Sequence, residues 1–379
     1  MLKILELFGG IGACSKALER LGIDYEIADY VEIDKYAVKS FNAIHNTNFE
    51  PQDITQWNKD IEVDLIMHGS PCQDFSLAGK QAGGDKDSGT RSSLMYETIR
   101  IVEKLKPKYV IWENVKNLLS KKHIHNFNAY LETMEQLGYK NYYQVLNAKD
   151  YGIPQNRERV FTVSILENEN YEFPKENIQE CEVINPLQGI SGKSWQFEQN
   201  VYSENSILRS LKAGGGSGNI PKVIEHFEFP SKQELKLKLK DMLENDVDEK
   251  YYLSGEQVNS IRHSNYNQNK RRIQEKEYAD TLCARDWKDP KCIQAAQMYG
   301  TEKEPTKLQI RKLTPKECWR LMGFDDKDFE KADKVNSNTQ LYKQAGNSIV
   351  VNILEAILDN LLIKPKIDEE IDKLLEKVS

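Results

Sequence analysis

The sequence predicts an α/β protein with a largely parallel sheet and a second, smaller and irregular domain. From Ile4 to about Leu146, short apolar runs typical of strands alternate with longer runs of helical period. From about Leu166 onward, polar loops and the glycine-rich run at 214–218 interrupt any regular period. We therefore expect a first domain at 1–180, a second at 181–310, a return of the chain to the first domain at 311–363 and a charged tail at 364–379.

The length and composition fit a protein of the cytoplasm with two domains, or with one domain that carries a large insertion. The chain has 379 residues, of which 39% are hydrophobic and 29% charged, so it can form a core under a polar surface. No apolar run approaches the roughly 20 residues of a membrane span. The start, Met1–Leu7, is too short and too acidic for a secretory signal. The six Cys show no paired metal-ligand spacing, which favours reduced thiols and no metal site.

The charge is unevenly distributed. The net charge of −7 argues against a simple basic nucleic-acid coat protein, although charge acts locally. Between residues 181 and 310 we count 19 Lys and Arg against 19 Asp and Glu, so the whole excess lies elsewhere. One stretch inside this segment, 257–274, has no acid and carries Arg262, His263, Lys270, Arg271 and Arg272. It is either a solvated basic loop or a surface that contacts phosphates.

The first strand leads into a glycine-rich turn. The run Ile4–Leu7 is followed by Phe8-Gly9-Gly10-Ile11-Gly12 and by a helical pattern from Ala13 to Leu21. Strand, glycine turn and helix are typical of a nucleotide-binding loop, because glycines let the backbone approach a ligand. Ser15 only partly matches the third small residue of a dinucleotide pattern, so this signal is weak by itself.

Two acidic residues, Glu32 and Asp53, follow the glycine turn in the sequence. Glu32 ends the strand that starts at Tyr25, about 20 residues after the turn, where an acid commonly binds ribose hydroxyls. The alternative is that Glu32 caps the helix at 35–44. Asp53 either accepts a hydrogen bond from an adenine amino group or caps a turn.

A cysteine and a glutamate follow two neighbouring strands. The run Val63–His68 predicts a strand that Gly69 and Pro71 end, so Cys72 lies just past the carboxyl end of a sheet strand, where ligands bind. By itself Cys72 could equally be an inert buried thiol. The loop at 77–90, with four glycines, is either a lid or a surface excursion. Another strand, Tyr109–Trp112, leads to Glu113 at the same edge.

Further elements complete the first domain. Helical patterns cover 92–105, with Ser92 or Ser93 as N-cap, and 123–137. The runs at 141–147 and 160–165 are typical of a strand hairpin. Between them lies Gln155-Asn156-Arg157-Glu158-Arg159, whose arginines could also pair with Glu158 or Asp150.

Taken together, these residues resemble the cytosine-5 DNA methyltransferase family of prokaryotes and phages. The resemblance covers about 1–165 and 310–360 and rests on eight short blocks in the family's order. The blocks are Phe8–Gly12, Glu32 with Asp53, Pro71-Cys72, Ser93-Leu94, Glu113-Asn114-Val115, the pattern Gln155-x-Arg157-x-Arg159, Arg311–Phe324 and Gln344–Val350. We see no departure from the family at a catalytic position.

The resemblance implies a Rossmann-like sheet that binds S-adenosylmethionine and a target-recognition domain at 181–310. The implied catalytic residues are Cys72, Glu113, Arg157 and Arg159. The implied cofactor-binding residues are Phe8, Gly10, Gly12, Glu32, Ile33, Asp53, Ile54, Pro71, Leu94 and Asn347. The residues that we expect to contact DNA are Gln155, Arg271, Arg272, Thr281, Leu282 and Arg285.

The chemistry of these residue types agrees with that assignment. Carbon 5 of cytosine is a poor nucleophile, but a thiolate that adds to carbon 6 turns the ring into an enamine that attacks a methyl donor. Glu113 would hydrogen-bond ring nitrogen 3, and the forked donors of Arg157 and Arg159 would hold the carbonyl and a phosphate. Because a stacked base cannot be reached, the cytosine would be flipped out of the duplex.

The sequence also carries expectations for the second half and for partners. We expect a helix at 232–244, a helix that starts near Thr314 with Glu317 completing a capping box, and a turn at 344–348 before a helix at 349–362. The expected partner is double-stranded DNA, with a separate cognate restriction endonuclease as a second candidate, and the expected state is a monomer.

Three other functions stay open at this stage. An RNA cytosine-5 methyltransferase would share the fold, and the 130-residue segment at 181–310 favours duplex DNA over it without excluding it. A non-catalytic DNA-binding regulator would not need Cys72, Glu113 and Arg159. A dinucleotide oxidoreductase would explain Gly10, Gly12 and Glu32 alone.

Overall fold

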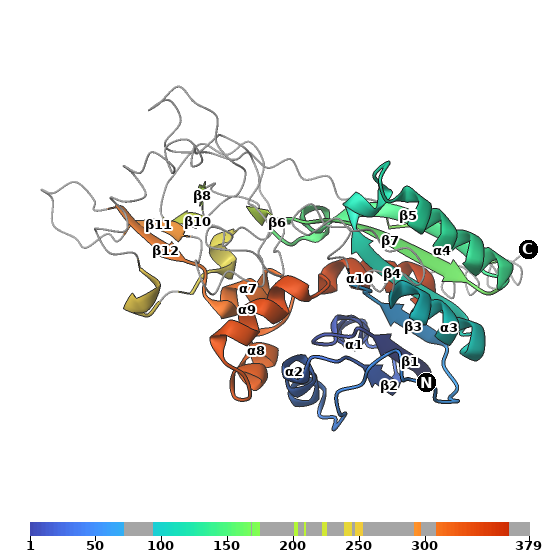
Figure 1. The fold of residues 1–379 in the computed structure, drawn as a ribbon. Coiled ribbons are helices and arrows are strands. Elements are labelled where there is room, and N and C mark those ends of the chain that lie inside the picture. Colours follow the sequence, from blue (N-terminus) through green and yellow to red (C-terminus); the bar gives the residue numbers. More distant parts are fainter. Residues whose placement is uncertain are drawn as a thin grey trace, which may run out of the picture. The chain divides into compact units, whose positions relative to one another are not determined.

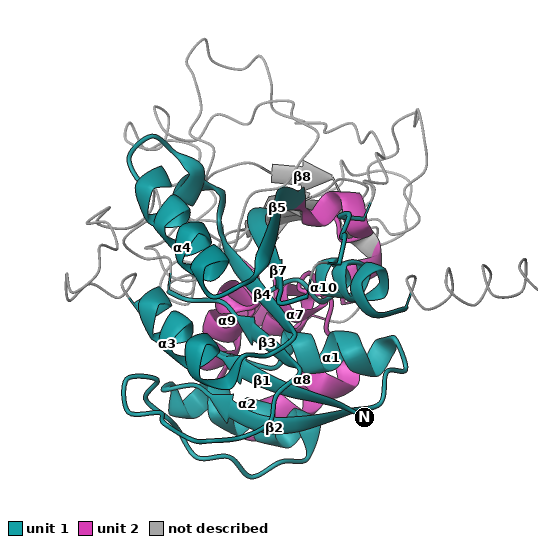
Figure 2. Ribbon diagram, turned by 90° about the vertical axis from the view of Figure 1, so that its right-hand side faces the viewer, with its two compact units in different colours: residues 1–146, 158–176, 349–379 teal, residues 147–157, 177–348 magenta. Residues whose placement is uncertain are grey.

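The computed structural model describes 1–71, 94–167, 169–174 and 308–363, together with short stretches of the segment between, at 201–203, 208–209, 222–225, 239–244, 247–252 and 292–296. The chain forms two compact units (Figure 2). Unit 1 comprises residues 1–146, 158–176 and 349–379, and unit 2 comprises 147–157 and 177–348.

Unit 1 is built on a six-stranded sheet with the order β2-β1-β3-β4-β7-β5 (Figure 1). The strands are β1 (Leu2–Leu7), β2 (Tyr25–Val31), β3 (Leu65–His68), β4 (Tyr109–Val115), β5 (Lys140–Asn147) and β7 (Glu158–Ile165). Strand β1 pairs in parallel with β2 and β3, β3 pairs in parallel with β4, and β7 is antiparallel to β4. The predicted α/β sheet is confirmed, and β7 lies next to β5 as expected for the hairpin.

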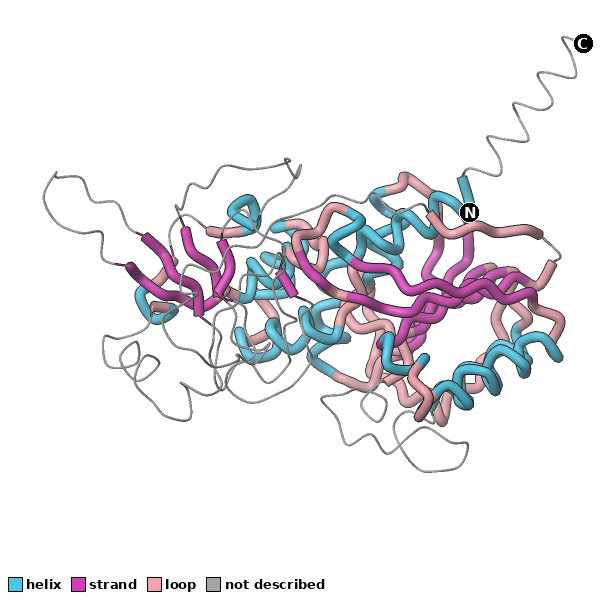
Figure 3. The backbone as a smooth tube through the Cα atoms, turned by 90° about the horizontal axis from the view of Figure 1, so that it is seen from above, coloured by secondary structure: helices cyan, strands magenta, loops and turns pink. Residues whose placement is uncertain are grey.

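Helices cover both faces of this sheet (Figure 3). They are α1 (Ala13–Arg20), α2 (Lys35–His45), α3 (Met95–Leu105), α4 (Ile124–Gln136), α10 (Val351–Leu358), the 3₁₀ turn Lys116–Leu119 and the π turn Asp359–Ile363. Helices α3 and α4 pack on one core through Met95, Phe127 and Tyr130, and α1 packs on α10, where Arg20 pairs with Glu355 at 3.2 Å. All four residues of β3 are buried, as expected for a strand covered on both faces.

Unit 2 combines small sheets with a helical cluster. Its strands are β6 (Gln155–Asn156), β8 (Val201–Ser203), β9 (Leu208–Arg209), β10 (Lys222–Glu225), β11 (Cys292–Ala296) and β12 (Leu308–Lys312). They pair in the order β12-β11-β10-β8 and β6-β9. Its helices are α7 (Pro315–Arg320), α8 (Asp326–Asp333), α9 (Asn338–Asn347) and the 3₁₀ turns Ala148–Tyr151, Leu239–Met242 and Glu249–Tyr251.

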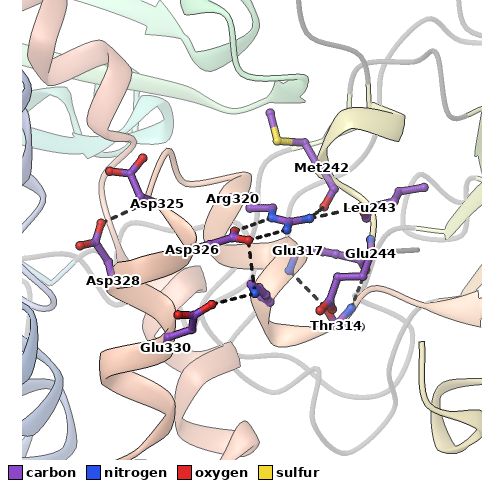
Figure 4. A network of polar contacts seen from close by, with 11 residues as sticks. Met242, Leu243, Glu244, Thr314, Glu317, Arg320, Asp325, Asp326, Asp328 and Glu330 are labelled. Carbon is purple, nitrogen blue, oxygen red and sulfur yellow. Dashed lines mark hydrogen bonds and ion pairs between the residues drawn. The ribbon is translucent and has the colours of Figure 1, made fainter. Parts of the chain in front are cut away.

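A polar network ties α7 and α8 to residues 242–244 (Figure 4). The Arg320 guanidinium donates twice to Asp326, at 2.7 Å each, and also to the carbonyls of Met242 and Leu243. This bidentate pair lowers the pKa of Asp326 to about 2. The predicted capping box at the start of α7 is confirmed: Thr314 accepts from the Glu317 backbone, and Glu317 accepts from the Thr314 backbone at 2.7 Å.

Several expected boundaries differ from the structure. Helix α7 ends at Arg320 because Gly323 takes a positive φ of 83° after it, and residues 311–312 belong to β12. Residues 344–347 lie in α9 and not in a turn. Within the expected helix at 232–244, the described residues contain a single 3₁₀ turn, Leu239–Met242. The strand that carries Glu113 continues to Val115 because β7 pairs with β4 as far as Val115 and Arg159.

In the division into two compact units, residues 311–348 belong to unit 2 and residues 349–379 to unit 1. The physical reason is the network described above, since Glu317 and Arg320 bind residues 242–244 of the middle segment. The roles that we assigned to the domains stay predictions. The tail at 364–379 and the loop at 77–90 lie outside the described residues.

Among the described residues, one helical stretch at 338–363 is long and apolar enough to cross a membrane, with a mean hydropathy of 1.4 and half of its best window buried in the protein. Extended backbone at Ser348 and Val350 separates α9 from α10 within it. Buried core helices pass the same test, so the stretch is weak evidence for a membrane span.

We expect Thr314→Ala to lower the free energy of unfolding by about 1–2 kcal/mol, because the variant loses the N-cap of α7. Urea unfolding at neutral pH measures the change. The control is Thr133→Ala, which removes a hydroxyl that donates to Ala129 within α4, where alanine suits the helix. An equal loss in both variants would contradict the capping argument.

Candidate active site

The glycine turn after β1 has an unusual backbone that the sequence dictates. Phe8, Gly10 and Gly12 take positive φ values of 53°, 57° and 81°. A Cβ on Gly12 would lie 2.2 Å from Nε2 of His45, so only glycine fits. At Gly10, a Cβ would meet nothing within 4 Å, so this part of the turn leaves space for a ligand. The left-handed Phe8 is a strained position of the kind found at binding sites.

Strand β2 holds this turn from the side. The Tyr30 hydroxyl donates to the Gly10 carbonyl at 2.6 Å, and Glu32 accepts from the Gly10 amide at 3.2 Å. Glu32 also accepts from the Asp34 amide at 2.8 Å, and Asp34 itself caps α2 through the Tyr36 amide. Burial raises the pKa of Glu32. The capping role that we considered for Glu32 therefore belongs to Asp34.

Other predicted cofactor residues lie in unit 1 in different settings. Ile33 is 68% exposed, which is unusual for a large apolar side chain. Asp53 accepts from the amide and hydroxyl of Thr55 at 2.9 Å each, which is the turn-capping alternative, and Ile54 is buried. Pro71 follows β3, and Leu94 directly precedes α3.

Sequence reasoning missed Glu6, a buried carboxyl at the end of β1. It accepts from the amide of Ser15 at 3.1 Å and from the Ser15 hydroxyl, in the first turn of α1. Burial raises its pKa to about 7. The signal in the sequence was an acid between Leu5 and Leu7, in the apolar half of the strand. Glu6 thus fixes the start of α1 directly behind the glycine turn.

The carboxyl ends of β3 and β4 lie side by side and bring a second group of residues together. Nε of Arg159 on β7 lies 3.0 Å from Oε1 of Glu113, and both side chains are mostly buried. This oxygen accepts no hydrogen bond from the described residues. Glu158, which we had considered as a partner of the arginines, pairs with Lys116 at 2.8 Å. A Cβ on Gly69 would lie 3.8 Å from Oε2 of Glu113, so the end of β3 adjoins this carboxylate.

Three predicted site residues belong to unit 2. Gln155 is fully buried, and its amide donates to the Leu321 carbonyl at 2.6 Å. The Arg157 guanidinium donates to the carbonyls of Ser348 at 2.7 Å and Gly346 at 3.4 Å, which fixes the end of α9. Asn347 in the last turn of α9 is exposed. Arg157 and Arg159 therefore belong to different units although one residue separates them.

Several predicted site residues lie outside the described part of the chain: Cys72, Arg271, Arg272, Thr281, Leu282 and Arg285. Among the described residues, no group of three or more His, Cys, Asp or Glu could hold a metal ion.

The chain matches the family model described as C-5 cytosine-specific DNA methylase over residues 2–362. The chain belongs to this family. It is 33% identical to the type II methyltransferase M2.ScrFI of Lactococcus lactis subsp. cremoris, over 95% of this chain and 99% of that protein. It is 30% identical to the orphan methyltransferase M.SPRI of Bacillus phage SPR, over 95% and 97% of the two chains.

Solved structures with low sequence identity share the fold. The Dnmt2 methyltransferase of S. pombe aligns with a TM-score of 0.59 at 18% identity, over 97% of this chain and 99% of that chain. The Entamoeba histolytica methyltransferase EhMeth aligns with a TM-score of 0.61 at 15% identity, over 95% and 98%. The family match, and not these structures, shows that the protein is a DNA (cytosine-5-)-methyltransferase that takes its methyl group from S-adenosylmethionine.

The glycine turn fits this methyl donor. A Cβ on Gly10 would meet nothing within 4 Å, so the turn leaves space at this residue, and Glu32 places a carboxylate beside it. The exposed Ile33 adds an apolar surface next to that acid. An acid that can accept hydrogen bonds from ribose hydroxyls, open space at a glycine and an apolar side chain that can pack on adenine fit the adenosine part of this methyl donor.

We expect Glu6→Gln to stabilise the protein at alkaline pH. The pKa of Glu6 lies near 7 in the folded state and near 4.5 in the unfolded state, so the wild type loses stability as the pH rises through this window. The free energy of unfolding of the variant should exceed that of the wild type by up to about 3 kcal/mol at pH 8 and by less than about 1 kcal/mol at pH 5. Urea unfolding at both pH values checks this, with Glu135→Gln on the surface of α4 as the control; an equal gain at the two pH values would contradict the assignment.

Proposed function

We propose that this methyltransferase acts at specific sites in duplex DNA, flips the target cytosine out of the helix and attacks it covalently with Cys72. The observation that carries the proposal is the ion pair of Glu113 with Arg159 at the carboxyl end of β4, beside the end of β3. Only Gly69, Ser70 and Pro71 separate β3 from Cys72 in the sequence. Topology therefore supports a nucleophile and a base-binding carboxyl group at one sheet edge.

The reaction steps balance with these residues. The Cys72 thiolate forms a bond to carbon 6, and the electron pair of the carbon 5–carbon 6 double bond then attacks the methyl group of S-adenosylmethionine. The bond from that methyl group to the sulfonium sulfur breaks, and S-adenosylhomocysteine leaves. Glu113, in its protonated form, donates a hydrogen bond to ring nitrogen 3 and so stabilises the negative charge that develops there. A base then removes the carbon 5 proton, the double bond re-forms, and the Cys72 thiolate leaves.

Arg159 has a defined task in this scheme. Its guanidinium contacts Oε1 of Glu113 at 3.0 Å, so we assign the other carboxyl oxygen, Oε2, to the base. The hydrogen bonds of Arg157 to Ser348 and Gly346 support a structural task for that residue in addition to the catalytic one that the family implies. We assign the cofactor to the turn at Phe8–Gly12 with Glu32, Ile33, Asp53, Ile54, Pro71, Leu94 and Asn347.

We further propose that residues 181–310 recognise the DNA sequence, with Arg271, Arg272, Thr281, Leu282 and Arg285 among the contacts. Gln155 would have to release its hydrogen bond to Leu321 to reach DNA, so an internal role for it is equally consistent. We also propose that the enzyme is a monomer, that it acts in the cytoplasm and that it does not bind a membrane. The type II name of one relative supports a separate restriction endonuclease as a partner.

The test of the covalent step is incubation with S-adenosylmethionine and duplex DNA that contains 5-fluorocytosine, followed by denaturing mass analysis. Fluorine cannot leave as the proton does, so an adduct should accumulate on the peptide that contains Cys72. Cys72→Ala should abolish both the adduct and methyl transfer while S-adenosylmethionine binding survives.

The matched control is Cys318→Ala, which removes a buried thiol of α7 and should keep turnover. Turnover retained by Cys72→Ala would exclude the covalent mechanism. An adduct with 5-fluorocytosine RNA and none with DNA would reassign the substrate to RNA, and sequencing of trapped DNA fragments would give the recognition site.

We expect the double substitution of Arg271 and Arg272 by Ala to weaken DNA binding and to reduce the slope of log K against log salt by roughly 2, since each lost phosphate contact removes about 0.9. Titrations at several salt concentrations measure this. Exposed Lys104 and Lys106, which lie at the other end of the sheet before β4, provide the control pair. An unchanged slope would show that residues 257–274 do not contact phosphates, and the alternative of a solvated basic loop would hold.

A further inference from the structure

Ser70 is bound from two sides by β4, although it lies in the short connection that follows β3. Its hydroxyl accepts a hydrogen bond from Nε1 of Trp112 at 3.0 Å, and its carbonyl accepts one from Nδ2 of Asn114 at 3.3 Å. An indole N–H can only donate, so the direction of the first bond is fixed. All three side chains are buried.

The two donors flank Glu113 in the sequence. Because successive residues of a strand point to opposite faces, Trp112 and Asn114 point to the face opposite Glu113. Gly69 and Ser70 follow the same alternation, since Gly69 adjoins the Glu113 carboxylate and Ser70 meets Trp112 and Asn114. Hence the Glu113 carboxyl group lies on one face of these two strand ends. On the other face, the hydrogen bonds from Trp112 and Asn114 to Ser70 connect the two strand ends.

Trp112 is itself held rigidly, which makes it a firm anchor. Its ring packs against Tyr130 of α4 at 4.2 Å and against His68 of β3 at 5.6 Å with nearly parallel planes. His68 in turn lies 3.2 Å from the Tyr130 hydroxyl. Burial lowers the pKa of His68 to about 3, so the ring stays neutral at working pH and the packing does not change with protonation.

The anchor acts over a very short length of chain. Pro71 is the one residue between Ser70 and Cys72, its ring fixes its own φ, and it restricts Ser70 to extended backbone. We propose that Ser70, clamped by Trp112 and Asn114, is a positioning residue that sets where the chain leaves β3 toward Cys72 relative to Glu113. The inference rests on the function proposed above, in which Cys72 is the nucleophile.

The experiment measures the rate of adduct formation with 5-fluorocytosine DNA and the Kd of S-adenosylmethionine for four variants of the full chain. Ser70→Ala and Trp112→Phe each remove one partner of the clamp. Ser164→Ala and Trp319→Phe are matched controls, because these side chains are equally buried and hydrogen-bonded, to Asn141 at 2.6 Å and to the Leu341 carbonyl at 3.0 Å.

We expect Ser70→Ala and Trp112→Phe to slow adduct formation by about 10-fold to 100-fold, since a displacement of about 1 Å suffices for such a loss. The Kd of S-adenosylmethionine should stay within about twofold of the wild type, which also reports that the fold is intact. Ser70→Ala and Trp112→Phe break the same hydrogen bond, the one between Trp112 and Ser70. The double variant should therefore form the adduct no more slowly than the slower of the two single variants.

The inference is overturned if the two clamp variants slow the adduct no more than the two controls, or if their effects add in full. If Ser70→Ala does not fold, the comparison of Trp112→Phe with Trp319→Phe decides. A wild type that forms no adduct would instead refute the covalent mechanism, so the two failures are distinguishable.

Discussion

The parallel pairing of β1 with β3 and of β3 with β4 is the constraint on which the site depends. Each of these strands delivers its carboxyl end to the same edge of the sheet, so residues far apart in the sequence arrive together. Through this pairing the glycine turn after Leu7, the connection after His68 and the carboxyl group of Glu113 lie along one edge. Antiparallel β7 then enters from the opposite direction and places Arg159, the residue opposite Val115, at that edge.

Buried polar groups fix the details that topology leaves free. Glu6 holds the start of α1, Glu32 and Tyr30 hold Gly10, and Trp112 with Asn114 holds Ser70. Removing such groups from water costs free energy unless each finds a partner, and here the partners are mostly backbone atoms of the connecting loops. The loops around the proposed site thus receive the rigidity that their sequences alone would not give them.

The sequence predicted the elements whose signals are local. The strand, glycine turn and helix at the start are written in consecutive residues, and the capping box of α7 lies within Thr314–Glu317. The extension of β4 to Val115 could not be predicted, because its partner β7 lies more than 40 residues later. Gly346-Asn347-Ser348 has the composition of a turn, yet α9 continues through Gly346, whose backbone is buried against its surroundings. The sequence also could not predict that Arg157 and Arg159 have different partners, because both residues fit the same short pattern.

These differences concern how each residue is held. Glu113, Arg159 and Glu32 lie where the pattern placed them, at the edge formed by the strand ends, because residue type and strand position together determine that edge. What the pattern could not contain is the support behind them. The indole of Trp112 and the buried carboxyl group of Glu6 come from positions that no short block includes, and the block that contains Asn114 does not show that its amide binds Ser70. Chemistry that depends on the distance between a nucleophile and a carboxyl group needs such support, because a loop that carries a reactive residue is otherwise the least constrained part of a fold.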